Sequence, residues 1–299
     1  MSQTVPVAVP RKGRPLEAVF ERLATITDVA ALADSVISTL RYEKAVTKGR
    51  QTADRGPYDR LAAYSDPDDP TAAEYTLLRD DRDGYPRRIV FDSATVAVGD
   101  LELRLIGREE PFRSLRTHEF ALGFDSADLV LEEVVELRPS GIGSLAEINA
   151  RINPKDTDVA VVTGLGDTVH HSLMATPERL GEGGHLDREF VAAHEGPLCI
   201  SPRYERLVEA VLGTETTAGI EFVYPADGTE EEAAIADVGL GVYLTVTGST
   251  ARDHGLVVGE QLFPSETVLM ENTAETGATA ERLKQLLTDP AIETELRVD

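Results

Sequence analysis

The sequence predicts an α/β protein with parallel or mixed sheets, folded as two lobes. Short apolar runs alternate with amphipathic segments along most of the chain, as strands alternate with helices in this class. A length of 299 residues suits two lobes or one large domain, and an apolar fraction of 41% is ample for a buried core. The Gly-rich, charged stretch between 174 and 196 is where we expect a hinge.

The first third of the chain predicts a strand, a loop and two helices. The run VPVAVP at 5–10 is typical of a short buried strand, and 15–26 has apolar residues at helical spacing with Pro15 in its first turn. A second amphipathic helix is expected over 28–40. The polar, Pro-rich run at 50–72 indicates a surface excursion.

Strands and helices alternate through the rest of the chain. Residues 88–106 alternate apolar with polar side chains around Gly99 and Asp100, as a half-buried hairpin or meander does. A helix stopped by Gly213 is also expected. The remaining predicted strands are 118–124, 129–137, 158–164, 196–201, 220–228 and 238–246, and the remaining helices are 143–152, 230–237 and 281–287.

The chain is strongly acidic. It has 29 Lys plus Arg against 53 Asp plus Glu, a formal net charge of −24, and no run rich in Lys or Arg. Phosphate backbones and anionic lipid would be repelled, so we expect neither a nucleic-acid nor a membrane partner. Lys is scarce among the basic residues, which favours a protein adapted to a salt-saturated cytoplasm; an ordinary acidic mesophile protein is the alternative.

Cys199 is the single cysteine, which excludes an intramolecular disulfide and any multi-thiolate metal site, and core packing is its expected role. No stretch approaches the roughly 18 to 20 apolar residues that a membrane helix requires. We therefore expect a soluble, cytoplasmic protein. His170 and His171 are adjacent and lack a metal-ligand spacing, so no metal-ligating residues are assigned.

The segment 238–256 carries the strongest functional pattern. An apolar strand runs into Thr247, Gly248, Ser249 and Thr250, and a polar helical start follows. Such a loop offers successive backbone N–H groups, hydroxyl donors and the positive end of a helix, which suit a phosphate group. Taken alone, an ordinary strand-to-helix turn with a Ser or Thr cap is a slightly better interpretation.

Three other segments accompany this loop. An apolar strand leads into Lys12-Gly13-Arg14 and a helix, DVAVVTG at 158–164 is a strand ending in Thr-Gly, and 199–212 joins a strand to a helix. Together with TGSTARDHGL at 247–256 they resemble ATP phosphoribosyltransferase, the enzyme that opens histidine biosynthesis. In that family a TGTT-type loop and a Leu-Arg-x-Asn-Gly-Leu run bind phosphoribosyl pyrophosphate. The resemblance spans roughly 1–40 and 140–275.

The resemblance implies a two-lobed fold of the periplasmic-binding-protein type (type II), with ligand in a cleft between lobes. The first lobe would comprise 1–175, with surplus length as a β-rich insertion at about 50–137. The second lobe, with the phosphate loop, would comprise 196–262. Residues 263–299 would return to the first lobe and end in a helix.

The implied activity is transfer of phosphoribosyl from phosphoribosyl pyrophosphate to a purine nucleotide, with Mg²⁺ as cofactor and a homo-oligomer left open. Lys12 and Arg14 would contact anionic substrate as catalytic residues. Thr247, Gly248, Ser249 and Thr250 would hold the 5′-phosphate. The solvated turn is an equal alternative for the two cations.

The chain departs from the family pattern at one position. An acidic residue usually stands four positions before the Thr-Gly pair, where it meets ribose hydroxyls or a metal, and here Tyr243 stands there. The nearest carboxylate upstream is Asp237, which is the candidate for that role. Glu230, Glu231 and Glu232 are assigned only a helix start. The alternative function is therefore a non-catalytic anion- or nucleotide-binding sensor or partner subunit on the same fold.

Overall fold

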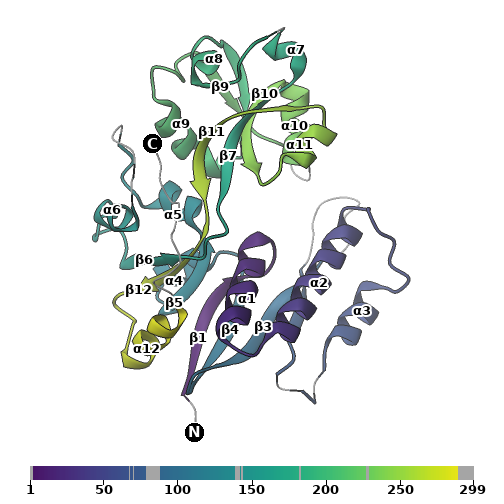
Figure 1. Cartoon of the computed structure of the whole chain (residues 1–299), viewed down its shortest axis with the longest axis vertical. Helices are drawn as coiled ribbons and strands as arrows, with labels where there is room; N and C mark the ends of the chain where they lie inside the picture. The colour runs from purple at the N-terminus through teal and green to yellow at the C-terminus, as the bar shows by residue number, and fades with distance from the viewer. Residues whose placement is uncertain are drawn as a thin grey trace. The chain divides into compact units, whose positions relative to one another are not determined.

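Two mixed β-sheets organise the chain, each in its own unit (Figure 1). The computed structural model describes residues 3–66, 68–69, 71–78, 88–138, 142, 144–181, 183–226 and 229–288. The first unit takes the described residues of Met1–Ser126, Thr157–Leu165 and Thr267–Glu293. The second unit takes those of Ala127–Asp156 and Gly166–Glu266. Each unit is described below by itself.

The first unit is built on a seven-stranded sheet of order β2-β3-β4-β1-β5-β12-β6. Its strands are β1 (Gln3–Pro10), β2 (Glu74–Leu78), β3 (Arg88–Val98), β4 (Leu101–Arg108), β5 (Leu122–Ser126), β6 (Val159–Gly164) and β12 (Thr267–Asn272). Its helices are α1 (Arg14–Ile26), α2 (Ala30–Thr47), α3 (Pro57–Tyr64), α4 (Pro111–Arg116) and α12 (Ala278–Leu287). The predicted strand at 5–10 and the helices at 15–26, 28–40 and 281–287 all appear among these elements.

Strand β1 lies inside this sheet because both of its edges are paired. It runs parallel to β4 from Gln3 opposite Leu101 to Pro10 opposite Arg108, and parallel to β5 on its other side. Val5, Val7 and Val9 are buried in one cluster with the apolar stripe of α1. Burying these branched side chains on a central strand stabilises the first unit by a few kcal/mol per residue at about 25 cal/mol per Å².

The expected β-rich insertion is not separate from the first unit. β3 and β4 form the predicted hairpin around Gly99 and Asp100, but β4 pairs with β1 over eight residues and both strands lie within the sheet. Leu101, Leu103 and Leu105 share the hydrophobic cluster of β1. The expectation of an accessory insertion is therefore wrong for 88–108, because these strands supply part of the unit's own core.

Two further expectations differ from the observed elements. The surface excursion at 50–72 contains α3, whose Arg60 reaches the buried carboxylate of Glu43 on α2 at 2.7 Å. The strand expected over 129–137 is instead the helix α5 (Ala127–Glu133). Leu129, Val130 and Leu131 are all buried there, and a short continuous apolar run does not distinguish a buried helix from a strand.

The second unit carries a five-stranded sheet of order β11-β7-β10-β8-β9. Its strands are β7 (Val169–Ala175), β8 (Gly196–Cys199), β9 (Ile220–Val223), β10 (Leu240–Thr245) and β11 (Val257–Ser265). Its helices are α5, α6 (Leu145–Ala150), α7 (Pro177–Leu180), α8 (Arg188–Ala192), the 3₁₀ turn η1 (Pro202–Tyr204), α9 (Glu205–Leu212), α10 (Glu231–Val238) and α11 (Ser249–Asp253). β8, α9, β9, α10 and β10 form two successive parallel crossovers.

The unit boundaries differ from the predicted lobes. The second unit already contains 127–156 and resumes at Gly166, whereas the sequence analysis placed everything up to 175 in the first lobe. The chain returns to the first unit at Thr267, and the segment 174–196 lies within the second unit, where it includes α7 and α8. Strand pairing across distant segments decides these boundaries, and the sequence alone does not display it. No helix of the described part of the chain is long and apolar enough to cross a membrane.

Candidate functional site

The loop at 247–250 leaves a central strand of the second sheet. β10 lies between β7 and β8, parallel to β8, so the loop follows the carboxyl end of a strand that is paired on both edges. Val246 is 74% exposed, and Thr247 and Ser249 are also exposed, while Gly248 is buried. The loop thus presents hydroxyl groups to solvent over a buried glycine, at the edge where α/β sheets bind ligands.

Position 248 requires a glycine, because its backbone is left-handed and there is little space for a side chain. Its φ of 66° and ψ of 13° are left-handed, and a Cβ there would lie 3.2 Å from both Arg252 Nη1 and Val258 Cγ2. It stands as the N-cap of α11 and offers no capping side chain to the helix amides. Thr247 Oγ1 lies 3.1 Å from Ser249 Oγ, so the two hydroxyls are side by side.

Charged groups of both signs surround this loop. Arg252 is exposed, and its guanidinium lies next to Gly248. Glu230 Oε2 lies 3.4 Å from His254 Nε2, which connects the start of α10 to the end of α11, and the two helices lie together in Figure 1. Sequence reasoning did not single out Arg252, although its place five residues after Thr247 was visible.

Tyr243 stands on β10 four residues before Thr247. Burial raises the pKa of its hydroxyl well above the ordinary value, and the charges of Glu231 and Glu232 and a hydrogen bond with Glu231 raise that pKa further. Its ring packs against the small hydrophobic cluster of Cys199, Ile235 and their neighbours. The phenol therefore stays protonated and is held in place beside the first turn of α10.

Asp237 lies at the wrong end of α10 for the role expected of it. Gly239, with a left-handed φ of 95°, turns the chain between α10 and β10, so helix and strand run in opposite directions. The contacts follow this order, since a Cβ on Gly241 would meet Ile235, while the charge of Glu231 raises the pKa of Tyr243. From Leu240 to Thr247 an extended chain covers about 20 Å, so Asp237 is remote from the loop. The first turn of α10 is the part that approaches it.

Lys12 and Arg14 lie at the carboxyl end of β1 in the first unit. Lys12 Nζ is 3.5 Å from Glu109 Oε2, and Arg14 is the first residue of α1. Because β1 and β4 are parallel, Arg108 reaches the same edge of the sheet. Arg11 donates from Nε to Gly107 O at 3.1 Å. Sequence reasoning missed Arg11 and Arg108, since the pairing of β1 with β4 is a long-range contact.

These basic side chains are matched by carboxylates. Arg11 lies 3.8 Å from Asp92, and Arg108 lies 3.8 Å from Glu119. The pairs are partly exposed, so each contributes at most about 1 kcal/mol to folding. An incoming anion could therefore replace a carboxylate partner at low cost. Lys12 and Arg14 belong to the first unit, and the loop at 247–250 belongs to the second.

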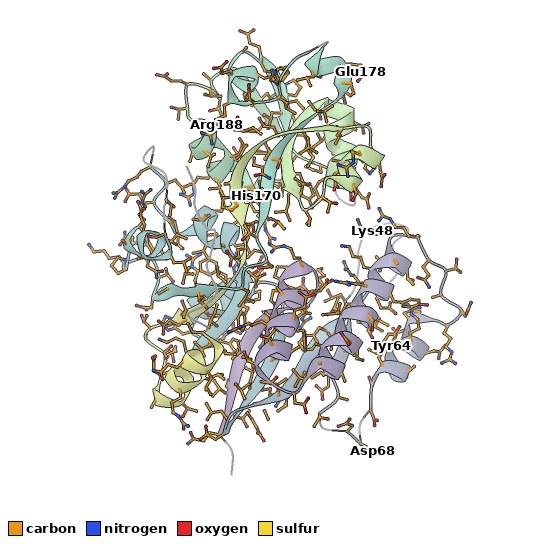
Figure 2. All side chains as sticks on the ribbon, in the orientation of Figure 1. Lys48, Tyr64, Asp68, His170, Glu178 and Arg188 are labelled. Atoms are coloured by element: carbon orange, nitrogen blue, oxygen red, sulfur yellow. The ribbon has the colours of Figure 1, made fainter. Side chains whose placement is uncertain are left out.

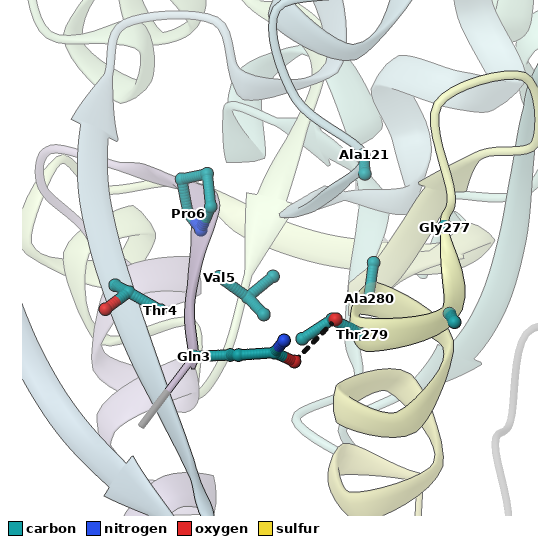
Figure 3. A pocket seen from close by; sticks show the side chains of 9 residues that line it. Gln3, Thr4, Val5, Pro6, Ala121, Gly277, Thr279 and Ala280 are labelled. Carbon is teal, nitrogen blue, oxygen red and sulfur yellow. Dashed lines mark hydrogen bonds between the residues drawn. The ribbon is translucent and has the colours of Figure 1, made fainter. Parts of the chain in front are cut away.

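A cavity of about 490 Å³ lies at the opposite end of β1 from Lys12. It is lined by the first residues of β1 and of α12, and Thr279 Oγ1 donates to Gln3 Oε1 at 2.9 Å (Figure 3). No Lys, Arg, Asp or Glu is among its lining residues. The cavity is therefore separate from the basic residues that follow β1 and β4, and it adds no charged group to the candidate site.

The histidines do not form a metal site. His170 lies on β7 (Figure 2) and is partly exposed, whereas His171 is buried, stacked on Phe263 and 3.7 Å from Asp128. Among the described residues there is no group of three or more His, Cys, Asp or Glu that could hold a metal ion. Cys199 is buried, which agrees with its expected packing role, and burial raises its pKa to about 11.

Comparison with known proteins decides the family. The sequence matches the family of halobacterial ATP phosphoribosyltransferases over residues 1–298. The chain belongs to this family. The resemblance seen in the sequence is thereby confirmed, and the two α/β units agree with the predicted periplasmic-binding-protein-like fold class, without a separate insertion. No curated protein matches the chain.

The solved structures that match the chain are distant from it in sequence. A chain of the ATP phosphoribosyl transferase (HisG:HisZ) complex from Thermotoga maritima is 14% identical, covers 95% of this chain and 94% of its own, and gives a TM-score of 0.44. The effector-binding domain of QuiR in complex with shikimate is 11% identical, with 62% and 79% coverage and a TM-score of 0.37. A periplasmic binding protein from Brucella ovis with glutathione bound is 10% identical, with 63% and 53% coverage and a TM-score of 0.38.

Proposed function

We propose that this protein transfers a phosphoribosyl group from phosphoribosyl pyrophosphate to a purine nucleotide, the reaction that the family name describes. The loop at 247–250 carries the proposal. Its buried left-handed glycine, paired hydroxyls and adjacent Arg252 supply donors and positive charge without bulk, as a phosphate monoester requires. Thr247, Gly248, Ser249 and Thr250 would hold the 5′-phosphate in this reaction.

Positioning and electrostatics would provide the catalysis. The bond between the ribosyl C1 and the pyrophosphate oxygen breaks, its electron pair leaves with pyrophosphate, and a purine nitrogen forms the new bond to C1. Lys12 and Arg14 would contact the anionic part of a substrate, since both follow the carboxyl end of β1, where Lys12 Nζ has only a 3.5 Å, partly exposed contact with Glu109. Arg11 and Arg108 would add positive charge at the same edge.

A resident Mg²⁺ is not supported by the residues present. The described part of the chain has no set of three metal-ligating side chains. Mg²⁺ commonly binds through one or two carboxylates together with substrate phosphates. A Mg²⁺ ion that acts here would therefore arrive with the pyrophosphate substrate, and the protein's own contribution is the set of donors described above. A cytoplasmic location and a homo-oligomer also stay predictions.

The test is release of pyrophosphate. Purified protein in molar KCl should release pyrophosphate from phosphoribosyl pyrophosphate when Mg²⁺ and a purine nucleoside triphosphate are both present, and the rate should fall when either is omitted. Lys12→Met should lower kcat/KM by about tenfold or more, because it removes one charge-assisted contact. Arg41→Met is the matched control, since Arg41 is an exposed cation of the same unit that pairs with Glu17.

One observation favours a second function. Tyr243 stands where the family usually has an acidic residue, which is consistent with a sensor or partner subunit that binds an anion or nucleotide without catalysis. That protein would bind phosphoribosyl pyrophosphate in a calorimeter and release no pyrophosphate with any purine nucleotide. Turnover with any of them would rule out this second function.

A further inference from the structure

A second cavity of the first unit lies away from the candidate site. Its volume is about 710 Å³, which is within the range of small-molecule sites. It is lined by the first half of α2, the end of α3, the residues that lead into β2, and the end of β3. Ala97 of β3 pairs with Glu102 of β4, which pairs with Thr4, so the cavity lies level with the amino end of β1. Lys12 and Arg14 follow the opposite end of that strand.

We propose that this cavity binds a small organic ammonium ion, whose alkyl groups lie against aromatic and aliphatic walls and whose charge meets two carboxylates. Such a site is independent of the phosphoribosyl transfer proposed above, because it shares no residue with the groups assigned to that reaction.

Two tyrosine rings form part of the wall. The rings of Tyr64, at the end of α3 (Figure 2), and Tyr75 on β2 have centroids 5.7 Å apart and are inclined at 56°. Tyr64 donates its hydroxyl to Glu43 Oε1 at 2.9 Å, and Arg60 holds the same carboxylate through bonds of 2.7 and 2.8 Å. The hydroxyl of Tyr64 is thus occupied, and its ring serves as a contact surface. The negative faces of aromatic rings attract cations, quaternary ammonium ions among them.

The charges of the lining are acidic. Asp28 and Asp69 line the cavity, and no Lys, Arg or His of the described chain does so. Asp69 Oδ1 accepts from the hydroxyl of Thr71 at 2.6 Å and from its N–H at 2.8 Å, and these bonds lower the pKa of Asp69. Asp28 stands just before α2, where the positive end of a helix favours a negative charge. A cavity with these charges repels phosphate esters and attracts a cation.

The apolar part of the lining favours an organic cation over an inorganic one. Val29, Leu32 and Val96 add aliphatic side chains beside the rings. A hydrated ion such as K⁺ would lose water against these walls without replacing it, whereas alkyl groups gain from burial. Among the described residues there is also no group of three or more His, Cys, Asp or Glu that could hold a metal ion.

Choline and its uncharged isostere 3,3-dimethylbutan-1-ol provide the test. Calorimetry in molar KCl should show saturable binding of choline, at least about fivefold tighter than that of the isostere, because only choline gains from the ring faces and the carboxylates. Asp69→Asn keeps the Oδ1 that accepts from Thr71 and removes the charge, so it should weaken choline by about threefold and leave the isostere unchanged. Tyr75→Leu should also weaken choline, whereas Tyr75→Phe, which keeps the ring, should not.

Asp34→Asn is the matched control. Asp34 is an exposed carboxylate of α2 that does not line the cavity, so its loss should leave the choline affinity within about twofold of the wild type. Circular dichroism melts would show which variants remain folded. If Tyr75→Leu unfolds, Asp69→Asn provides the test, because that position is exposed and the bonds with Thr71 are kept.

Three outcomes would overturn the site. They are the absence of saturable choline binding, equal affinities for choline and its isostere, and an equal loss of choline affinity in Asp34→Asn and Asp69→Asn, which would show attraction to the acidic surface as a whole. Pyrophosphate release is measured without choline, so its failure would count against the proposed function alone.

Discussion

Two glycines shape the candidate site because they lack a side chain. Gly248 combines a left-handed backbone with a position where a side chain would crowd Arg252 and Val258. Gly239, which is also left-handed, reverses the chain between α10 and β10, so that the first turn of α10 lies toward the end of β10. In both cases the absence of a Cβ is the functional property, because it permits a turn that another residue would strain.

Gly248→Val should weaken phosphate binding strongly, and the strain of its left-handed backbone should cost about 1 to 3 kcal/mol of stability without unfolding the protein. The valine side chain would block the approach of an anion to the amides, with loss of several charge-assisted hydrogen bonds of roughly 1.5 to 3 kcal/mol each. Binding of phosphoribosyl pyrophosphate, measured by calorimetry at equal salt, should weaken by about two orders of magnitude or more.

Gly277→Val is the control for this substitution. Gly277 has a φ of −87° and open space where its Cβ would lie, so valine there should preserve the affinity. Equal affinities of wild type and Gly248→Val would remove the main support for the anion site.

At the level of elements, reciprocal capping connects α5 to α9. Arg206 donates to carbonyls at the end of α5, to Glu132 O at 2.6 Å from Nε and to Val135 O at 3.1 Å from Nη1. The Glu132 carboxylate in turn accepts from the backbone N–H of Leu207 at 2.7 Å. Each helix thus satisfies terminal groups of the other, which contributes to the stability of the helix at Ala127–Glu133.

Arg206→Met should destabilise the protein by about 2 to 3 kcal/mol, because carbonyls at the end of α5 lose their donors while the aliphatic packing is kept. Urea unfolding at constant salt would measure it as a lower midpoint with an unchanged slope. Arg203→Met, at an exposed position of η1, should change the free energy of unfolding by less than about 0.5 kcal/mol. Similar losses in the two variants would contradict the capping role.

The net charge of the whole molecule is −24, and it generates strong repulsion among surface carboxylates. At molar salt the Debye length is about 3 Å, against about 30 Å at 10 mM, so repulsion among the excess carboxylates is screened only in concentrated salt. The family's halobacterial description fits this composition. We therefore expect the charge to affect solubility and folding in salt, while the local donors of the site determine which ligand binds.

The melting temperature should rise by roughly 10 °C between 10 mM and 2 M KCl, which corresponds to a few kcal/mol of relieved repulsion. Differential scanning calorimetry would measure it. Sucrose at the same osmolality should reproduce only a small part of the rise, because it does not screen charge. A melt that is identical at both salt concentrations would refute the salt requirement.

Side-chain periodicity and contiguous motifs were sufficient to predict the α/β class, most of the strands and helices, the family, and a strand-to-helix loop at 247–250. They did not predict the place of β3 and β4 in the sheet, the helical state of 127–133, or which end of α10 lies beside Tyr243. Sequence counting pointed to Asp237, whereas the reversal at Gly239 places the first turn of α10, with Glu231, near Tyr243. Tertiary structure decided these points because pairing between distant strands, and the direction in which a helix folds back on its strand, place together residues whose separation along the chain carries no such information.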